Sequence, residues 1–207
     1  MEQTRGRGRP PVTTRDAVED VAMTLFEERG IENTTVVDIA EACQMSKTSF
    51  FRYFTSKNDI LWGAFEGHVQ AMKEMLRSQP ADAPILPTLR EGIRELIVAE
   101  TEHVESWLRR FRFQNTDEQR ALTLIHWGEW ESTVAEYIRD RSKAPAASLI
   151  PDAMAGTLRG AFRAFLRHWV LSGNTNIEDL LKGYDEALAP VFGGLEMYLA
   201  RIPKAHA

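Results

Sequence analysis

The chain has few of the residues from which metal and redox sites are built. It carries one cysteine, Cys43, in 207 residues, so it cannot form an intrachain disulfide. Cys43 falls on a predicted buried stripe, where a small apolar side chain is a better interpretation than a reactive thiol. None of the five histidines stands at metal-ligand spacing from another. The cluster Glu100, Glu102, His103 and Glu105 fits a solvated helix face better than a metal site.

The sequence also lacks the signatures of enzymes and membrane proteins. It contains no nucleophile elbow, no Gly-rich phosphate loop after a strand and no paired-cysteine motif, so we expect neither a cofactor nor an enzymatic activity. No apolar run approaches the roughly 18 residues of a membrane span. The Arg- and Gly-rich N-terminus has no apolar core and is not a secretory signal. Together these absences predict a cytoplasmic protein.

Residues 35–57 have the pattern of two short helices joined by a tight turn. Thr35 can N-cap the first helix, with Asp38 as its capping-box partner. Gln44 and Met45 form the predicted turn. Four residues recur at helical spacing and predict one buried stripe on the first helix: Val36, Ile39, Ala40 and Cys43.

The second helix of this stretch has an apolar face and a polar face. Ser46 can cap it, and Phe50 and Phe54 form its inner side. The other side chains point outward or lie at the rim: Lys47, Thr48, Ser49, Phe51, Arg52 and Tyr53. Short hydroxyls suit base edges and cations suit phosphates, so this face is typical of a recognition helix in the DNA major groove. An ordinary helical hairpin with a solvated polar face is the alternative.

The stretch resembles the DNA-binding signature of the tetracycline-repressor (TetR/AcrR) family of bacterial regulators. The residues that carry the resemblance are Thr35, Ile39 and Ala40, then Ser46-Lys47, Phe50, Tyr53-Phe54, Ser56-Lys57 and Asp59-Ile60-Leu61. The resemblance implies a double-stranded DNA operator as partner. It assigns DNA contacts to Thr35, Lys47, Thr48, Ser49, Phe51, Arg52, Tyr53 and Lys57.

Two positions depart from the usual pattern of this family. Gln44 stands where the turn usually has Gly, and it accepts a small strain if its φ is positive. Phe51 stands where Tyr is usual, so a phosphate-binding hydroxyl is missing. We expect Tyr53 and Lys57 to supply more of that phosphate contact.

The net charge of −5 hides a segregated distribution. Residues 1–15 hold four arginines against one glutamate, residues 44–57 hold three cations and no acid, and residues 16–41 hold eight acids against one arginine. Positive charge is therefore concentrated where DNA contacts are expected. Within the basic arm, Arg7 and Arg9 flank a glycine as in minor-groove AT-hook peptides, which predicts contact with A·T-rich DNA. A solubilising tail is the alternative.

The pattern along the whole chain predicts an all-α fold of about nine helices, with no strand-type alternation. Besides the two short helices, we expect helices over 14–29, from after Ser56 to about 79, and over 88–104, 106–114, 117–143, 151–171 and 177–200. We predict a flexible basic arm (1–13), a three-helix DNA-binding domain (14–57), a connecting helix (58–79) and a helical ligand-binding and dimerisation domain (80–207). A proline-rich break over 80–87 separates the last two.

Aromatic and methionine side chains are frequent after the DNA-binding stretch, and such side chains can line an adaptable apolar cavity. The candidates are Phe65, Met72, Trp107, Phe111, Trp127, Trp130, Phe165 and Trp169. Plain core packing is the alternative, but the family resemblance implies a pocket for a small-molecule effector here. Arg109, Arg110 and Arg112 could lie at its mouth and favour an anion, or form a solvated basic face.

The resemblance also implies a homodimer built by the last two helices. These helices carry more apolar residues than one helix pair should bury within one domain, which predicts a two-fold four-helix bundle. Gly156 and Gly160 would allow close helix approach. We expect the interface to contain Leu158, Phe162, Tyr184, Leu188, Phe192 and Leu195.

The sequence therefore predicts a ligand-responsive transcriptional regulator, with repressor as the favoured sense. Residues 50–54 and 56–60 and Trp62-Gly63 resemble a subgroup of the family thought to regulate mycofactocin biosynthesis genes, which implies a long-chain acyl-CoA as effector. A DNA-binding architectural protein without an effector is one alternative. An enzyme that uses the aromatic cavity is the other.

Overall fold

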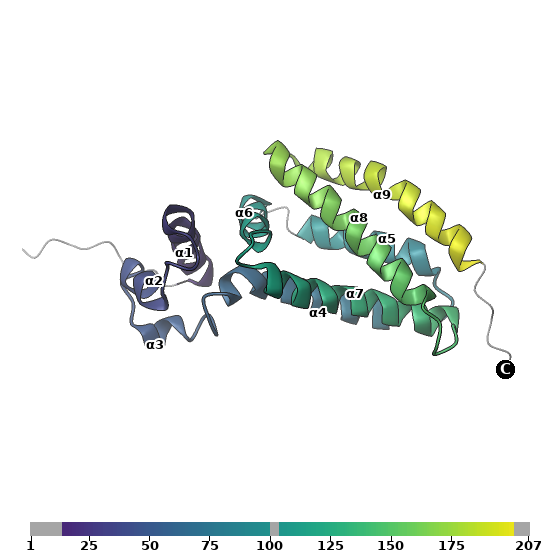
Figure 1. Cartoon of the computed structure of the whole chain (residues 1–207), viewed down its shortest axis with the longest axis horizontal. Helices are drawn as coiled ribbons and strands as arrows, with labels where there is room; N and C mark the ends of the chain where they lie inside the picture. Colours follow the sequence, from purple (N-terminus) through teal and green to yellow (C-terminus); the bar gives the residue numbers. More distant parts are fainter. Residues whose placement is uncertain (1–13, 100–103, 201–207) are drawn as a thin grey trace, which may run out of the picture. The chain divides into compact units, whose positions relative to one another are not determined.

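The computed structural model describes residues 14–99 and 104–200, and all the regular structure within them is helical. Nine helices lie in these ranges, which confirms the predicted all-α fold and helix number. The chain divides between Gly63 and Ala64 into two compact units, the first coloured purple to blue and the second blue to yellow in Figure 1.

The first unit contains α1 (Arg15–Arg29), α2 (Val36–Ala42), α3 (Lys47–Phe50) and the first turn of α4 (Asp59–Ser78). α1 begins one residue later than expected, because the Thr14 hydroxyl accepts a hydrogen bond from the Ala17 amide and caps the helix. α1 ends at Gly30, whose φ of 80° suits glycine.

The apolar stripes of α1, α2 and α3 meet in a common core. Phe26, Ile39, Phe50 and Phe54 are buried there. Cys43 is fully buried among them, and this burial raises the pKa of its thiol. The predicted burial of Cys43 is therefore confirmed.

The second unit consists of the rest of α4 with α5 (Ile85–Ala99), α6 (Val104–Gln114), α7 (Arg120–Ser142), α8 (Ile150–Ser172) and α9 (Ile177–Leu199). α8 runs between α7 and α9 and packs against both, and α5 packs against α7 and α9 (Figure 1). α8 thus buries two of its faces within one chain.

Several helix ends differ from those expected. α5 begins at Ile85 rather than 88, because Pro87 in the first turn needs no partner for its missing N–H. α7 begins at Arg120 rather than 117, since residues 117–119 form a turn. The connecting helix expected over 58–79 is α4, which starts in the first unit and continues into the second.

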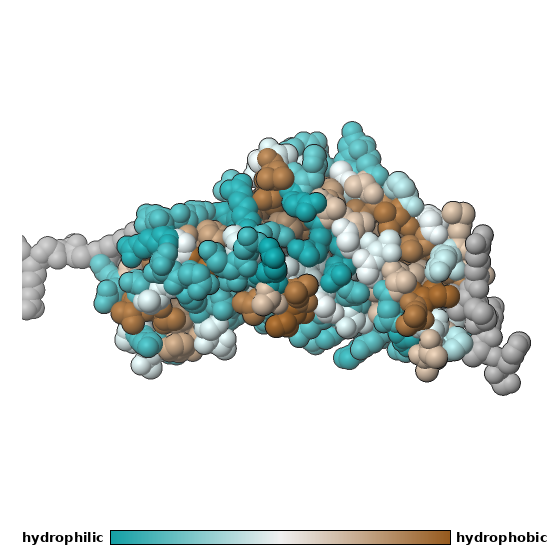
Figure 2. Space-filling model, in the orientation of Figure 1, coloured by the Kyte–Doolittle hydropathy of each residue, from teal (hydrophilic) through white to brown (hydrophobic). Residues whose placement is uncertain are grey.

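The surface of the face shown in Figure 2 is mainly hydrophilic, with separate hydrophobic groups over each of the two units. The most exposed large apolar side chains of the described residues are Leu171, Leu149, Met197, Leu124 and Ile125. No helix in these residues combines the length and apolar content that crossing a bilayer requires.

Candidate functional site

The turn between α2 and α3 is closed by the helix-ending hydrogen bonds of a Schellman motif. The Met45 amide donates to Ala40 O at 2.9 Å, and the Gln44 amide donates to Glu41 O at 3.0 Å. Gln44 has a φ of 56°, the left-handed conformation in which the sequence analysis predicted a small strain. A non-glycine residue in this conformation costs about 1–2 kcal/mol. The turn therefore keeps its geometry at the expense of some strain.

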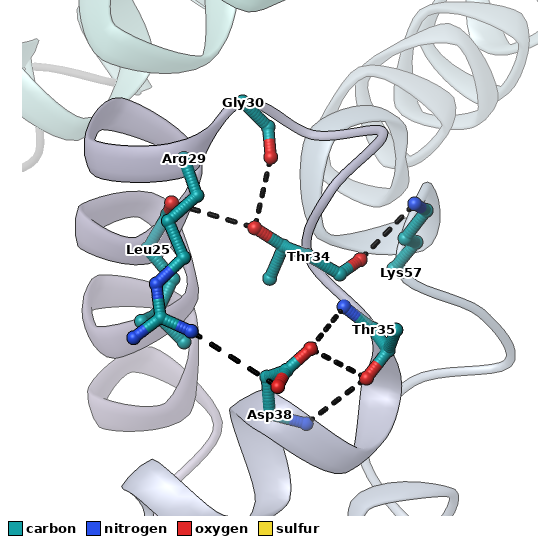
Figure 3. Close-up of polar contacts among 7 residues, drawn as sticks. All are labelled: Leu25, Arg29, Gly30, Thr34, Thr35, Asp38 and Lys57. Atoms are coloured by element: carbon teal, nitrogen blue, oxygen red, sulfur yellow. Dashed lines mark hydrogen bonds and ion pairs between the residues drawn. The ribbon is translucent and has the colours of Figure 1, made fainter.

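The start of α2 is held by the predicted capping box (Figure 3). The Thr35 amide and hydroxyl both donate to Asp38 Oδ2, at 2.7 Å and 2.6 Å, and the Thr35 hydroxyl accepts from the Asp38 amide. The hydrogen bonds from Thr35, assisted by Arg29 at 4.0 Å, hold the pKa of the Asp38 carboxyl below its usual value. The Thr35 hydroxyl, expected to contact DNA, thus already donates and accepts within the helix cap.

Lys57 makes contacts that its sequence position did not suggest. Its ammonium donates to Ile31 O at 2.6 Å and to Thr34 O at 3.1 Å (Figure 3 draws the second bond). The Thr34 hydroxyl in turn donates to Gly30 O at 2.8 Å. Lys57 therefore ties the segment after α3 to the connector between α1 and α2. Two of its three protons are used in this way, which leaves less for the expected phosphate contact.

α3 presents a polar edge because its apolar residues point inward. Phe50 and Phe54 are buried, and their rings lie 5.4 Å apart. Lys47, Thr48 and Arg52 are exposed on the other side. The helix ends at Phe50, and tighter turns carry the chain through 51–53.

The remaining predicted contact residues differ in how free they are. The Ser46 hydroxyl caps α3 by accepting from the Ser49 amide, and the two hydroxyls lie 2.9 Å apart. Ser49 and Tyr53 are half-buried. Phe51 is 48% exposed and touches the edge of the Phe50 ring. Arg7 and Arg9 lie outside the described residues.

Arg15 is a residue of this unit that the sequence interpretation missed, because it was counted with the basic arm. Its guanidinium donates to Tyr53 O at 2.6 Å and lies 4.5 Å from the centre of the Phe54 ring. It also pairs with Asp59 at 3.6 Å. Arg15 therefore joins α1 to both ends of the 53–59 segment. No local sequence signal marks this contact, since Arg15 and Tyr53 are 38 residues apart.

The second unit contains a small cavity of about 50 Å³, lined mainly by aromatic and aliphatic side chains and open to solvent. Five of the eight expected pocket residues line it: Phe65, Trp107, Phe111, Trp127 and Trp130. Phe65 and Trp127 lie 4.9 Å apart between ring centres, so the α4 and α7 sides of the cavity are in contact. The cavity has the apolar character of a site for an apolar or amphipathic ligand.

Three expected pocket residues do not line this cavity. Met72 follows the lining residue Val69 by three positions and is buried, but it is not part of the lining. Phe165 and Trp169 pack against each other on α8, and Phe165 also packs against Tyr184 of α9 at 6.1 Å, outside the cavity lining. Phe162, expected in the dimer interface, lines the cavity instead and stacks on Trp130 at 6.2 Å.

Polar side chains also reach the cavity, and the sequence interpretation identified one of them. Arg110 is 7% exposed and lines the cavity, as do Gln114 and His68. Arg112 is exposed and Arg109 is half-buried, and neither is part of the lining. Glu100, Glu102 and His103 lie outside the described residues.

The residues expected at the dimer interface are buried within one chain. Leu158, Phe162, Tyr184, Leu188, Phe192 and Leu195 are all at most 9% exposed. Their burial follows from the packing of α8 between α7 and α9 and of α9 against α5 and α8. The premise that one chain cannot bury these residues was wrong.

The exposed faces of α8 and α9 carry small residues. On α8 they are Ala153, Thr157, Gly160 and Ala164, and on α9 they are Ala187, Pro190 and Gly194, followed by Met197. A Cβ atom at Gly160 or Gly194 would meet only open space. Each series recurs every three or four residues and so forms a stripe along its helix.

The capped pair α2 and α3, with a polar edge and a buried aromatic side, is a helix-turn-helix of the DNA-binding type. Residues 20–62 match the bacterial regulatory proteins of the tetR family, and residues 83–195 match the MftR C-terminal domain. The chain therefore belongs to the TetR family of bacterial transcriptional regulators and has an MftR-type C-terminal domain.

Full-length relatives agree with this assignment. The chain is 28% identical over 179 residues to a Mycobacterium tuberculosis protein that carries the name mycofactocin biosynthesis transcriptional regulator MftR, with 84% of this chain and 88% of the relative covered. It is 26% identical over 183 residues to the regulator TcmR of Streptomyces glaucescens, with 84% and 81% covered.

Solved structures show the same fold. The repressor FadR of Thermus thermophilus, in complex with lauroyl-CoA, matches with a TM-score of 0.56 at 23% identity, over 87% of this chain and 94% of that one. The SmeT–triclosan complex matches with a TM-score of 0.62 at 17% identity, over 87% and 90%. At these identities the likeness establishes the fold only.

Proposed function

We propose that this protein is a transcriptional repressor that leaves its operator when a small apolar or amphipathic effector binds, and that it has no enzymatic activity. The observation that carries the DNA part is the edge of α3, where Lys47 and Thr48 are exposed while Phe50 and Phe54 anchor the helix in the core. The first residues of a recognition helix are the ones that meet base edges in the major groove.

The contacts divide into base-reading and phosphate-binding groups. Thr48 is exposed at the start of α3 and suits a base edge, with Ser49 beside it. Lys47 and Arg52 are exposed cations and suit phosphates. We assign Lys57 mainly to holding the connector between α1 and α2, because its ammonium is hydrogen-bonded there.

The cavity supports an effector over an architectural protein with a filled second unit. Its lining is aromatic and aliphatic, and the MftR-type domain makes the mycobacterial regulator the most informative relative for this part of the chain. The FadR structure holds lauroyl-CoA and the SmeT structure holds triclosan, so this fold takes ligands of both shapes in other proteins. An acyl-CoA is the effector that we favour.

We propose that two chains pair through the exposed stripes of α8 and α9 rather than through the residues first expected. The small side chains of both stripes permit close approach of helices, and a two-fold pairing would give an isologous four-helix bundle. Such a dimer would hold two recognition helices for two half-sites about 34–36 Å, one DNA turn, or a multiple of that apart.

The DNA assignment is tested with an operator selected from random duplexes. Fluorescence anisotropy on the selected duplex and on random DNA compares wild type with Thr48→Ala and Lys47→Ala. We expect Thr48→Ala to change the preference among sequences. Lys47→Ala should weaken binding to both duplexes alike. It should also reduce the slope of log affinity against log salt concentration by about 0.9. Equal losses on both duplexes for Thr48→Ala would contradict base reading by α3.

The dimer assignment is tested by light scattering on Ala164→Glu. A carboxylate at this exposed stripe position would be buried without a partner in the proposed interface, so we expect monomers. Ala121→Glu, at an exposed position on α7, is the matched control and should leave the oligomer unchanged. An unchanged dimer in Ala164→Glu would move the interface away from this stripe.

A further inference from the structure

We propose that Phe51 selects thymine in the operator, by packing its exposed ring against the 5-methyl group of that base in the major groove. The inference rests on the proposed DNA-binding edge of α3 and adds a specificity-determining residue to it. The side chains assigned to base edges and phosphates on this edge are all polar: Lys47, Thr48, Ser49 and Arg52. Phe51 adds a large apolar surface to them.

Phe51 is one of two large apolar side chains that the first unit leaves exposed. In the part of this unit that the structure describes, the exposed fractions are 48% for Phe51 and 45% for Val37. The other phenylalanines of the unit, Phe26, Phe50 and Phe54, are at most 1% exposed. Burial is the usual fate of a phenyl ring in a folded protein. The unit buries its other phenyl rings and leaves this one at its surface, where a partner can cover it.

The backbone places Phe51 on the same face as the residues that suit DNA. Its amide donates to Lys47 O at 3.1 Å and its φ and ψ are −68° and −4°, so the helical turn of α3 continues through it. Side chains three and four residues apart on a helix are neighbours, and Phe51 therefore lies beside Thr48 and Lys47. Both of these side chains are exposed. A duplex that meets Lys47 and Thr48 thus also meets the ring of Phe51.

The ring of Phe51 is supported by the core of the unit. The centres of the Phe51 and Phe50 rings lie 5.5 Å apart, and the ring planes are inclined by 84°. Phe50 is fully buried and packs in turn against Phe54. Edge-to-face contact is a favourable arrangement of two aromatic rings. Phe51 therefore presents a positioned apolar surface to a partner, which selectivity for one base requires.

Thymine carries the one methyl group among the base edges of the major groove, and this group distinguishes it from the other bases. A phenyl ring has neither a donor nor an acceptor, so Phe51 cannot hydrogen-bond to a phosphate or to a polar base edge. It can pack against a methyl group and remove it from water. A helix rises about 1.5 Å per residue and DNA about 3.4 Å per base pair. We therefore expect this thymine within about two base pairs of the pair that Thr48 reads.

The test uses the full chain and the operator selected from random duplexes, with each thymine replaced in turn by deoxyuridine. Deoxyuridine pairs with adenine in the same way but lacks the 5-methyl group. We expect replacement of the contacted thymine to weaken binding, measured by fluorescence anisotropy, by about fourfold, the factor that corresponds to burial of one methyl group. Phe51→Ala should bind the unmodified operator at least about fourfold more weakly and lose no further affinity with deoxyuridine there. Phe51→Leu, which keeps an apolar side chain, should retain part of the deoxyuridine penalty.

Two control variants separate Phe51 from the other apolar groups near the DNA. Val37→Ala shortens the other exposed apolar side chain and should change neither the affinity nor the deoxyuridine penalty. Thr48→Ser removes a methyl group from the same face but keeps the hydroxyl, and it should leave the penalty at that thymine in place.

Two results would overturn the selection of thymine by Phe51 while leaving the DNA-binding function intact. One is a wild type that binds the operator but tolerates deoxyuridine at every thymine, and this result does not depend on whether any variant folds. The other is an undiminished deoxyuridine penalty in Phe51→Ala. A chain that selects no duplex at all would instead overturn the proposed function itself.

Discussion

The interactions that stabilise the first unit differ in range from those that stabilise the second. In the first unit, the helix-turn-helix is fixed by hydrogen bonds between near neighbours, such as Thr35 with Asp38 and Ser46 with Ser49. In the second unit, aromatic rings from distant helices meet: Phe65 of α4 contacts Trp127 of α7, and Phe162 of α8 contacts Tyr184 of α9. Local polar bonds give a fixed surface, whereas non-local apolar packing can enclose a cavity.

The difference suits two kinds of recognition. A DNA-reading edge needs side chains at set positions, and short caps supply this with little buried area. A cavity for an apolar ligand needs many large side chains that separate around it, which only several helices together can provide. We therefore expect substitutions in the second unit to change stability most, and those in the first unit to act through single hydrogen bonds.

Phe162→Ala should have the largest effect on stability. The ring is buried between Trp127, Trp130 and Tyr184, so its removal should lower the free energy of unfolding of the second unit by about 3–5 kcal/mol. Urea unfolding followed by tryptophan fluorescence measures this change. Ala121→Ser, at an exposed position on α7 outside the proposed dimer stripes, is the control and should stay within about 0.5 kcal/mol. A loss below about 1 kcal/mol would mean that the aromatic cluster is not the core of this unit.

Lys57→Met should act next most strongly, and in the first unit. It removes the hydrogen bonds of a charged donor to Ile31 O and Thr34 O, which we expect to cost about 1.5–3 kcal/mol. Amide hydrogen exchange should rise in the connector between α1 and α2. Lys47→Met, at an exposed position, should leave stability unchanged and weaken DNA binding only. The reverse result, a Lys57→Met variant of unchanged stability that binds all DNA weakly, would indicate that Lys57 contacts a DNA phosphate after all.

Gln44→Gly should stabilise the first unit. Glycine relieves the left-handed strain at a φ of 56° but loses more chain entropy on folding, so we expect a net gain of about 0.5–1 kcal/mol. The midpoint of thermal unfolding should rise. Gln44→Ala is the control, since it keeps the strain and should not raise the midpoint. A destabilised Gln44→Gly would show that the Gln44 side chain itself supports the turn.

Asp38→Asn should have the smallest effect, and one that depends on pH. The folded pKa of Asp38 is lowered, so the capping box stabilises the fold above the ordinary value of 3.8 and loses this contribution as the pH falls through the folded pKa. The difference in melting temperature between wild type and Asp38→Asn should be constant near neutral pH and vanish in acid. Glu41→Gln on the same helix, outside the capping box, should show no such convergence.

The sequence was sufficient where the structural cause is local. The caps at Thr35 and Ser46, the stop at Gly30 and the positive φ of Gln44 depend on residues no more than a few positions away. The contacts of Lys57 and Arg15 bridge 26 and 38 residues, so no periodicity could indicate them. These contacts change which cations of the first unit remain available for DNA.

In the second unit, the apolar stripe of α8 predicted which residues are buried but not which helices or cavity they contact. α8 packs against α7 and α9, so Phe162 lines the cavity and also contacts Tyr184 of α9, whereas Phe165 contacts Tyr184 without lining the cavity. The apolar residues that the sequence interpretation placed in a dimer interface are buried by this packing within one chain. Only the packing of α8 against α7 and α9 shows where the free surface lies.

The last turns of α9 carry a feature that bears on its local cooperativity. Pro190 stands inside the helix and leaves Glu186 O without its usual amide donor, and Gly193 and Gly194 follow it. Proline and glycine disfavour a helix interior by about 3 and 1 kcal/mol each. Only the buried Phe192 and Leu195 compensate within this segment. This end of α9 should therefore open locally more often than the rest of the helix. A partner that binds the closed helix end would suppress this opening, and the more so the higher the concentration of that partner.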